Sequence, residues 1–128
     1  MRSTTVLLVD DSAPFRALMR EILAQEPACQ VVGEAADGAE ALALAQALQP
    51  DIVLLDLTMP RVSGLEALPR LKAACPAPRV IVVTVHAEDA YHQAAAARGA
   101  DAFLLKKTLG TTLLPTLRAL RQARAGPA

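Results

Sequence analysis

The chain has 128 residues, enough for one domain with a hydrophobic core and too few for two ordinary domains. Its 13 basic and 13 acidic residues cancel and only 2% of residues are aromatic, so composition favours neither nucleic-acid binding nor an anionic membrane surface. Hydrophobic residues make up 53%, but no apolar run approaches a membrane span of ~18 residues and no signal-peptide pattern precedes the first predicted strand. We expect a soluble, cytoplasmic protein.

Two stretches combine the pattern of a buried strand with an acidic end. Ile52–Leu55 is an unbroken apolar run, as expected for a strand buried on both faces of a parallel sheet, and Asp56 follows it directly. Thr5–Val9 is a similar run that leads into Asp10 and Asp11. A buried carboxylate costs several kcal/mol, roughly, unless a metal or an opposite charge compensates. Ligands of open parallel sheets bind at such strand ends, so we expect chemistry there.

Helical periodicity fills the segments between the predicted strands. Ser12 is expected to cap a first helix that ends at Pro27 and whose buried stripe is Phe15, Leu18, Met19, Ile22 and Leu23. After a short strand at 30–33, the Asp37–Gly38 turn leads into a second helix that reaches about Gln49. Its predicted inner face consists of Ala41, Leu44, Ala45 and Leu48.

The helix predicted after Gly64 contains a proline. Pro69 lacks a backbone donor, so we expect this helix to start late or to kink there. Another buried strand is predicted at Arg79–Thr84, ending in a hydroxyl, and an alanine-rich helix at 88–98. The inner face of the helix with the proline is predicted to be Leu65, Leu68 and Leu71.

The last strand and helix complete the pattern. Ala102–Leu105 is predicted as the fifth strand, and Lys106 follows it. The final helix is expected at Thr111–Arg124 with a threonine cap and with Pro115 in its first turn, followed by a frayed tail at 125–128. Its buried residues should be Leu113, Leu114, Leu117 and Leu120.

Five strands alternating with five helices predict an α/β domain over residues 1–128, a doubly wound parallel sheet with helices on both faces. The flavodoxin-like strand order 2-1-3-4-5 is the natural arrangement for five such units. It places the first and third strands side by side at the switch point, so Asp10, Asp11 and Asp56 should meet there.

The side chains expected at this edge suit phosphoryl chemistry with a metal. Three clustered carboxylates repel one another, and Mg²⁺ relieves such repulsion because it binds carboxylate and phosphate oxygens. Lys106 and Thr84 can then contact an arriving phosphoryl group. Asp-Asp-Ser follows the first strand where a nucleotide-binding chain would carry glycines, and no Ser-His-Asp arrangement is present. Neither His86 nor His92 has a partner at ligand spacing, and we expect both to be ordinary surface or loop residues.

The motifs along the chain resemble those of receiver domains of bacterial two-component response regulators. They are Val-Asp-Asp-Ser at 9–12, Leu-Leu-Asp-Leu-x-Met-Pro at 54–60, Val-Val-Thr at 82–84 and Gly-Ala-Asp-Ala-Phe-Leu-Leu-Lys at 99–106. The resemblance implies a phosphoprotein of phosphorelay signalling, with a sensor histidine kinase or phosphotransfer protein as donor. It implies no enzyme activity beyond weak self-dephosphorylation.

The resemblance also implies a role for each site residue. Asp56 would be the phospho-acceptor, and Lys106 and Thr84 would contact the phosphoryl group. Phe103 would act with Thr84 as a rotamer switch. Mg²⁺ would be bound by Asp10, Asp11, Asp56 and the main-chain carbonyl of Thr58.

Two positions depart from the usual receiver pattern. Lys107 stands where many receivers have a proline after a cis bond, so a cis peptide at Lys106–Lys107 would be costly. Val85 stands after Thr84 where a small residue is usual. The segments Leu-Leu-Lys-Lys at 104–107 and Thr-Val-His at 84–86 are most similar to those of receivers that are coupled to a helix-turn-helix output domain.

Two other functions remain open from sequence. One is a haloacid-dehalogenase-like, Mg²⁺-dependent phosphatase, although that family has a second Asp two residues after its nucleophile, where this chain has Thr58. The other is a constitutive pseudo-receiver that only binds protein. For a receiver, we expect an output domain or a homodimer to use the face formed by the fourth helix, the fifth strand and the fifth helix, with no direct contact to nucleic acid or membrane. The chain ends after the last helix, which fits both a stand-alone regulator and a receiver cut from a longer one.

Overall fold

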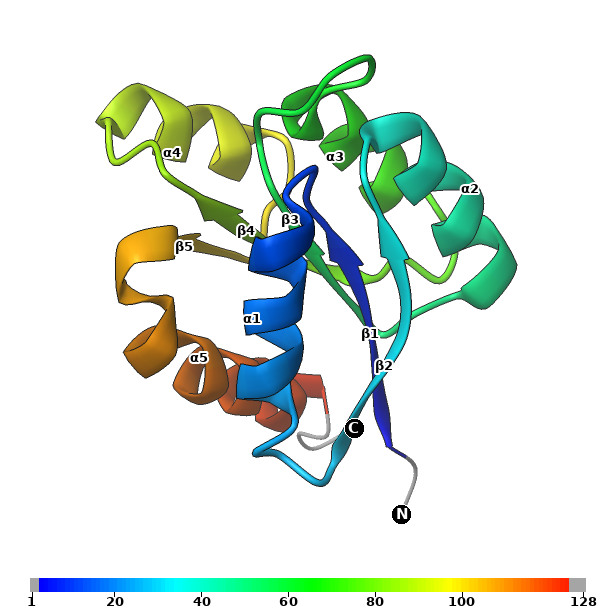
Figure 1. The fold of residues 1–128 in the computed structure, drawn as a ribbon. Coiled ribbons are helices and arrows are strands. Elements are labelled where there is room, and N and C mark those ends of the chain that lie inside the picture. Colours follow the sequence, from blue (N-terminus) through cyan, green and yellow to red (C-terminus); the bar gives the residue numbers. More distant parts are fainter. Residues whose placement is uncertain (1–2, 125–128) are drawn as a thin grey trace.

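In the computed structural model, which describes residues 3–124, five strands form one parallel sheet in the order β2-β1-β3-β4-β5 (Figure 1). This confirms the predicted class and strand order. The strands are β1 (Thr4–Val9), β2 (Cys29–Ala35), β3 (Ile52–Leu55), β4 (Arg79–Thr84) and β5 (Ala102–Leu105). The helices are α1 (Ala13–Leu23), α2 (Gly38–Leu48), α3 (Gly64–Lys72), α4 (Asp89–Ala97), the 3₁₀ helix η1 (Lys106–Thr108) and α5 (Leu109–Arg124).

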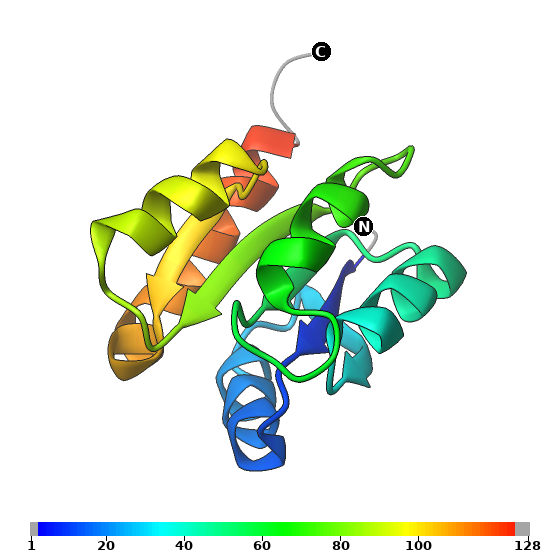
Figure 2. The ribbon, with the colours of Figure 1, turned by 90° about the horizontal axis from the view of Figure 1, so that it is seen from above.

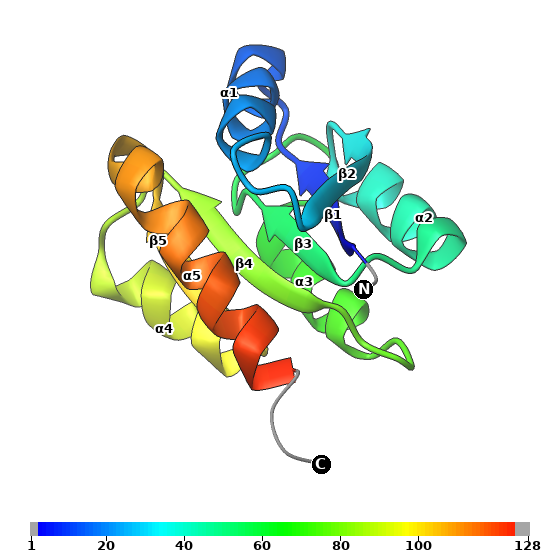
Figure 3. The ribbon, with the colours of Figure 1, turned by 90° about the horizontal axis from the view of Figure 1, so that it is seen from below.

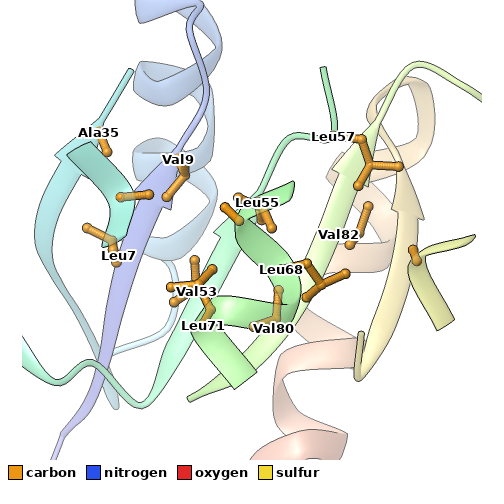
Figure 4. Close-up of a cluster of buried hydrophobic side chains, with 13 residues drawn as sticks. Leu7, Val9, Ala35, Val53, Leu55, Leu57, Leu68, Leu71, Val80 and Val82 are labelled. Atoms are coloured by element: carbon orange, nitrogen blue, oxygen red, sulfur yellow. The ribbon is translucent and has the colours of Figure 1, made fainter. Parts of the chain in front are cut away.

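Alternate strand residues face opposite sides of the sheet, and both sides are buried. One cluster contains Leu7, Val9, Val53, Leu55, Val80 and Val82 from the strands (Figure 4). The residues between them form a second cluster, with Val6, Leu8, Ile52, Leu54, Ile81 and Val83. This is why the central strands β1, β3 and β4 contain unbroken apolar runs.

The helices cover the two faces of the sheet in unequal numbers. Helices α2, α3 and α4 contribute to the first cluster, whereas α1 and α5 contribute to the second (Figures 1 and 3). The result is a three-layer sandwich with a central sheet. Within the described residues, no helix combines the length and apolar character needed to cross a membrane.

The strand register determines which side chains meet at the edge where the strands end. Val9 of β1 pairs with Leu55 of β3, so the residues that follow, Asp10 and Asp56, leave the sheet as neighbours. Figure 2 shows the molecule from above, where the arrowheads mark the ends of the strands. Gly64, the first residue of α3, is constrained by this edge, because a Cβ there would lie 1.9 Å from the Asp56 carbonyl oxygen. Only glycine allows α3 to start so close to the end of β3.

The expected late start of α3 is wrong. The helix begins at Gly64, directly after Ser63, whose hydroxyl accepts a hydrogen bond from the Glu66 N–H while the Glu66 carboxylate accepts one from the Ser63 N–H. This capping box stabilises the first turn. Pro69 then lies inside the helix, beyond that turn.

The predicted start of the last helix is also wrong. Helix α5 begins at Leu109, and η1 precedes it. Leu109 is buried against the second cluster, whereas the Thr111 hydroxyl donates to the Thr108 carbonyl and so lies within the helix. Burial of Leu109 therefore outweighs the capping preference of threonine. Pro115 consequently falls inside α5 and not in its first turn.

Two leucines predicted to be buried are exposed. Leu18 of α1 is 42% exposed, because the helix faces the sheet through Met19, Ile22 and Leu23. Leu48, the last residue of α2, is 41% exposed and lies over Gly33 of the edge strand β2. Both leucines lie beside, and not within, the buried stripe.

One cis peptide bond occurs in residues 3–124, at Cys75–Pro76, so the Lys106–Lys107 bond is trans. A cis bond after Lys106, which the sequence indicated would be costly, is therefore absent from the described residues. The predicted fray at 125–128 lies outside the described residues.

Candidate phosphoryl-transfer site

Three carboxylates meet at the ends of β1 and β3, as the strand order predicts. One oxygen each from Asp10, Asp11 and Asp56 lies within 4.8 Å of the others. Asp10 and Asp56 are buried, at 0% and 4% exposure, and Asp11 is exposed. The cluster therefore has a buried floor and an open side that a ligand can approach.

The backbone of the following loops partly satisfies the buried carboxylates. The Ser12 N–H donates to Asp10 Oδ1 at 2.8 Å, and the Thr58 N–H donates to Asp56 Oδ1 at 3.4 Å. Asp10 Oδ2 is buried and accepts no hydrogen bond of good geometry in the described part of the chain. A buried anionic oxygen in this condition calls for a cation.

Lys106 supplies one positive charge. It follows β5, and its Nζ lies 2.7 Å from Asp10 Oδ2 and 3.6 Å from Asp56 Oδ2. The close approach of the ammonium to the buried Asp10 carboxylate is an ion pair. One ammonium cannot neutralise three carboxylates, and the cluster keeps an excess of negative charge.

The pKa of Asp56 reflects this environment. This pKa is raised from 3.8 to about 6, chiefly by burial and next by the neighbouring Asp10 carboxylate, whereas Lys106 and the Thr58 N–H lower it. The Asp56 carboxylate is thus held in its ionised form at neutral pH at a cost in free energy. Binding of a cation would relieve that cost.

Thr84 ends β4 at the same edge of the sheet. It is fully buried, and its register partner is Leu105, the residue before Lys106. The Thr84 hydroxyl oxygen accepts a hydrogen bond from the His86 N–H at 3.1 Å. The next residue, Val85, is 66% exposed.

Phe103 lies on β5, next to α4. It is half-buried and packs against the first core cluster, and the His92 ring stacks on it with centroids 4.7 Å apart. A second pair, His86 on Tyr91, has centroids 4.3 Å apart. The expectation that both histidines are ordinary surface residues missed these contacts, because periodicity does not show which rings from different elements meet.

The donor set fits Mg²⁺. This cation takes oxygen ligands, usually one or two carboxylates together with waters and phosphate oxygens. The three clustered carboxylates, which share the single ammonium of Lys106, match that preference. Thr58, the remaining candidate, lies in the loop after Asp56 with an exposed side chain.

Three residues near the site were not identified from the sequence. The ring of Phe15 lies under the Lys106 ammonium, 4.4 Å from Nζ to the centroid. Arg16 Nη1 donates to the Asp10 carbonyl at 2.5 Å, and Arg61 forms an ion pair with the buried Asp37. The sequence carried no signal for these contacts, since each joins residues from separate elements or loops.

Comparison with known proteins gives a consistent result. The sequence matches the model of the response regulator receiver domain over residues 6–118. The nitrate/nitrite response regulator protein NarL of Escherichia coli K12 is 41% identical over 124 residues, covering 95% of this chain and 55% of NarL. This chain therefore spans about half the length of such curated relatives.

Solved structures agree with the sequence comparison. The response regulator domain of Thermotoga maritima CheB superposes with a TM-score of 0.85 at 33% identity, covering 99% of this chain and 100% of that chain. A chain of the CheX–CheY–BeF₃–Mg²⁺ complex from Borrelia burgdorferi gives a TM-score of 0.87 at 26% identity, covering 94% and 90%.

Proposed function

Because this chain belongs to the response regulator receiver domain family, we propose that Asp56 accepts a phosphoryl group from a sensor histidine kinase or a phosphotransfer protein. The observation that carries this assignment is the position of Asp56. Its carboxylate is buried at a strand end, within 4.8 Å of two further carboxylates and 3.6 Å from the Lys106 ammonium. Small acyl phosphates can replace the protein donor.

The same proposal assigns Mg²⁺ to Asp10, Asp11, Asp56 and the main-chain carbonyl of Thr58. Bound Mg²⁺ supplies positive charge to the acidic cluster and to the transferring phosphoryl group. Its support here is the excess of three clustered carboxylates over the single ammonium of Lys106. The Borrelia complex that resembles this fold also contains Mg²⁺ and BeF₃.

The residues of the chain then have defined tasks in the transfer. A carboxylate oxygen of Asp56 forms a bond to phosphorus while the bond from phosphorus to the donor imidazole nitrogen breaks, and the imidazole leaves with the electron pair. Lys106 pairs with one phosphoryl oxygen, and the Thr84 hydroxyl donates a hydrogen bond to another. At present the Thr84 oxygen accepts a hydrogen bond from the His86 N–H, so its hydroxyl hydrogen can be directed at the phosphoryl group when the side chain moves inward.

Phosphorylation is proposed to change the face formed by α4, β5 and α5. Thr84 moves toward the phosphoryl group, and Phe103 fills the space that is left. The face includes Tyr91 and Leu113, and we propose it as the contact for an output domain or a second copy. Curated relatives such as NarL are about twice as long as this chain, which leaves room for an output domain in such proteins.

No observation favours the other two candidate functions. A haloacid-dehalogenase-like phosphatase would need a second acid where Thr58 stands. A pseudo-receiver would not need a buried acidic cluster next to a lysine, which costs folding free energy. We therefore propose that the domain acts as a phosphorylated switch and neither as a dedicated enzyme nor as a direct binder of nucleic acid or membrane.

Chemical trapping tests this proposal. After incubation with acetyl phosphate and Mg²⁺, borohydride reduction converts an aspartyl phosphate to homoserine, and peptide mapping locates the reduced residue. We expect homoserine at position 56. Homoserine at Asp10 or Asp11 would contradict the assignment of the acceptor.

A further inference from the structure

The aromatic ring of Phe15 contacts the proposed phosphoryl-binding lysine. Phe15 lies in the first turn of α1, and the Lys106 Nζ lies over its ring, 4.4 Å from the centroid. This distance is well within the range of a cation–π interaction. The side chain of Lys106 is 16% exposed, so the contact is largely shielded from water.

A closed series of contacts links this ring to the acidic cluster. The Ser12 N–H donates to Asp10 Oδ1 at 2.8 Å, and the Ser12 hydroxyl accepts from the Phe15 N–H at 3.2 Å. The Phe15 ring contacts Lys106, whose ammonium returns to Asp10 Oδ2 at 2.7 Å. The cap of α1 therefore fixes the ring relative to the same carboxylate that the lysine neutralises.

The Phe15 ring differs from the carboxylates around Lys106 because it does not bind a metal ion or a phosphoryl group. Asp10 and Asp56 attract the ammonium, but each would also be engaged by a metal ion or by a phosphoryl group. Phe15 packs against the second core cluster and has no such competing ligand. Lysine has a flexible four-carbon stem, so a fixed contact near its end restricts where the ammonium can go.

We propose that Phe15 is a positioning residue for Lys106, holding the ammonium beside Asp56 when Asp10 is engaged elsewhere. This inference rests on the proposed phosphoryl transfer to Asp56. It predicts that loss of the ring slows the transfer without weakening donor binding, because the positioned charge acts on the reacting group.

The test compares Phe15→Leu, which keeps apolar bulk, with Phe15→Tyr, which keeps the ring face. Met19→Leu, a buried position on the same helix, is the packing control. With acetyl phosphate, we expect the maximal phosphorylation rate to fall about two- to fivefold in the leucine variant and to stay near wild type in the other two. The half-saturating donor concentration and the Mg²⁺ affinity should change by less than about twofold.

A second measurement uses the metal-free protein and does not depend on activity. NMR relaxation of the Lys106 side chain should show greater mobility in Phe15→Leu than in wild type, Phe15→Tyr or Met19→Leu. Progressive fluorination of the ring at position 15 weakens its attraction for cations with little change of shape. It should lower the rate stepwise, and this series decides the matter if the leucine variant does not fold.

Each outcome is decisive. Equal rates and equal Lys106 mobility across the leucine, tyrosine and fluorinated proteins would overturn the role of Phe15. A wild-type protein that takes no phosphoryl group at Asp56 would overturn the proposed function, whereas the mobility measurement would still test the contact between Phe15 and Lys106.

Discussion

The ammonium of Lys106 lies 2.7 Å from Oδ2 of Asp10, a carboxylate with no exposure to solvent. The same nitrogen is farther, 3.6 Å, from Asp56 Oδ2. The one nearby lysine thus offsets the charge of Asp10 more than that of Asp56. Asp56 is left undercompensated, which agrees with the rise of its pKa to about 6.

This imbalance predicts that Asp56→Asn stabilises the metal-free domain at pH 7.5. Since the folded-state pKa lies above the ordinary value of 3.8, the folded protein binds this proton more tightly, and its stability rises as pH falls from 7 toward 4. After allowance for solvent screening, we expect a gain of about 1–2 kcal/mol at pH 7.5 that shrinks toward zero near pH 4.

Urea denaturation in EDTA at several pH values measures this effect. Glu21→Gln, an exposed site on α1, serves as the control and should leave stability unchanged. Added Mg²⁺ should stabilise the wild type more than Asp56→Asn, because a ligand stabilises the folded state that binds it. A destabilised asparagine variant at pH 7.5 would show that Asp56 does not carry an uncompensated charge.

The metal assignment predicts unequal losses from two substitutions at the same sheet edge. Asp11→Asn removes a member of the acidic cluster and should weaken Mg²⁺ binding at least about tenfold. Thr84→Ala removes a hydroxyl that accepts a hydrogen bond from the His86 N–H, and it should leave Mg²⁺ affinity within about twofold of wild type. Isothermal titration calorimetry gives both values, and equal losses would argue against these roles.

The stacked pair of His92 and Phe103 predicts a bias in the proposed switch. The stack favours the present orientation of Phe103, so His92→Ala should lower the beryllofluoride concentration needed for half-saturation by about two- to fivefold. Gln93→Ala, the neighbouring exposed position on α4, is the matched control. Amide NMR signals of α4, β5 and α5 report the titration, and identical curves for the two variants would exclude a role for the stack.

The exposed position of Val85 predicts a gate for small molecules. Val85 follows Thr84 at the end of β4 and is 66% exposed, and we expect its side chain to narrow the approach of water and donor to Asp56. Val85→Ala should therefore speed both dephosphorylation and uptake from acetyl phosphate, by up to ~10²-fold, with Mg²⁺ affinity unchanged. Leu48→Ala, an exposed apolar site at the end of α2, controls for loss of bulk, and stopped-flow rates that match this control would refute the gate.

Sequence was sufficient for the sheet and for the acidic cluster. Ile52–Leu55 of β3 and Val80–Val83 of β4 are unbroken apolar runs because both faces of the sheet are buried, and the bounds of both strands match the prediction. Their order then brings Asp10 and Asp56 together without any information about side-chain orientation. The residues that follow each strand can therefore be assigned to one edge of a parallel sheet from the sequence pattern alone.

Contacts between separate elements could not be predicted in the same way. Periodicity identified Phe15 as an apolar residue of α1. The position of the Lys106 ammonium over its ring depends on the direction that the chain takes from β5 into η1. The start of α5 was missed for a similar reason, because the burial of Leu109 is decided by tertiary packing. Local preferences at Thr111 and Pro115 gave no indication of it.

The identity of the phospho-acceptor is the central claim, and intact-mass spectrometry tests it most directly. Wild-type protein treated with acetyl phosphate and Mg²⁺ should gain one phosphoryl group that hydroxylamine removes, as should Asp51→Asn, which alters the buried carboxylate just before β3. Asp56→Asn should gain none. Labelling of Asp56→Asn to the wild-type level would contradict the assignment of Asp56 as the acceptor.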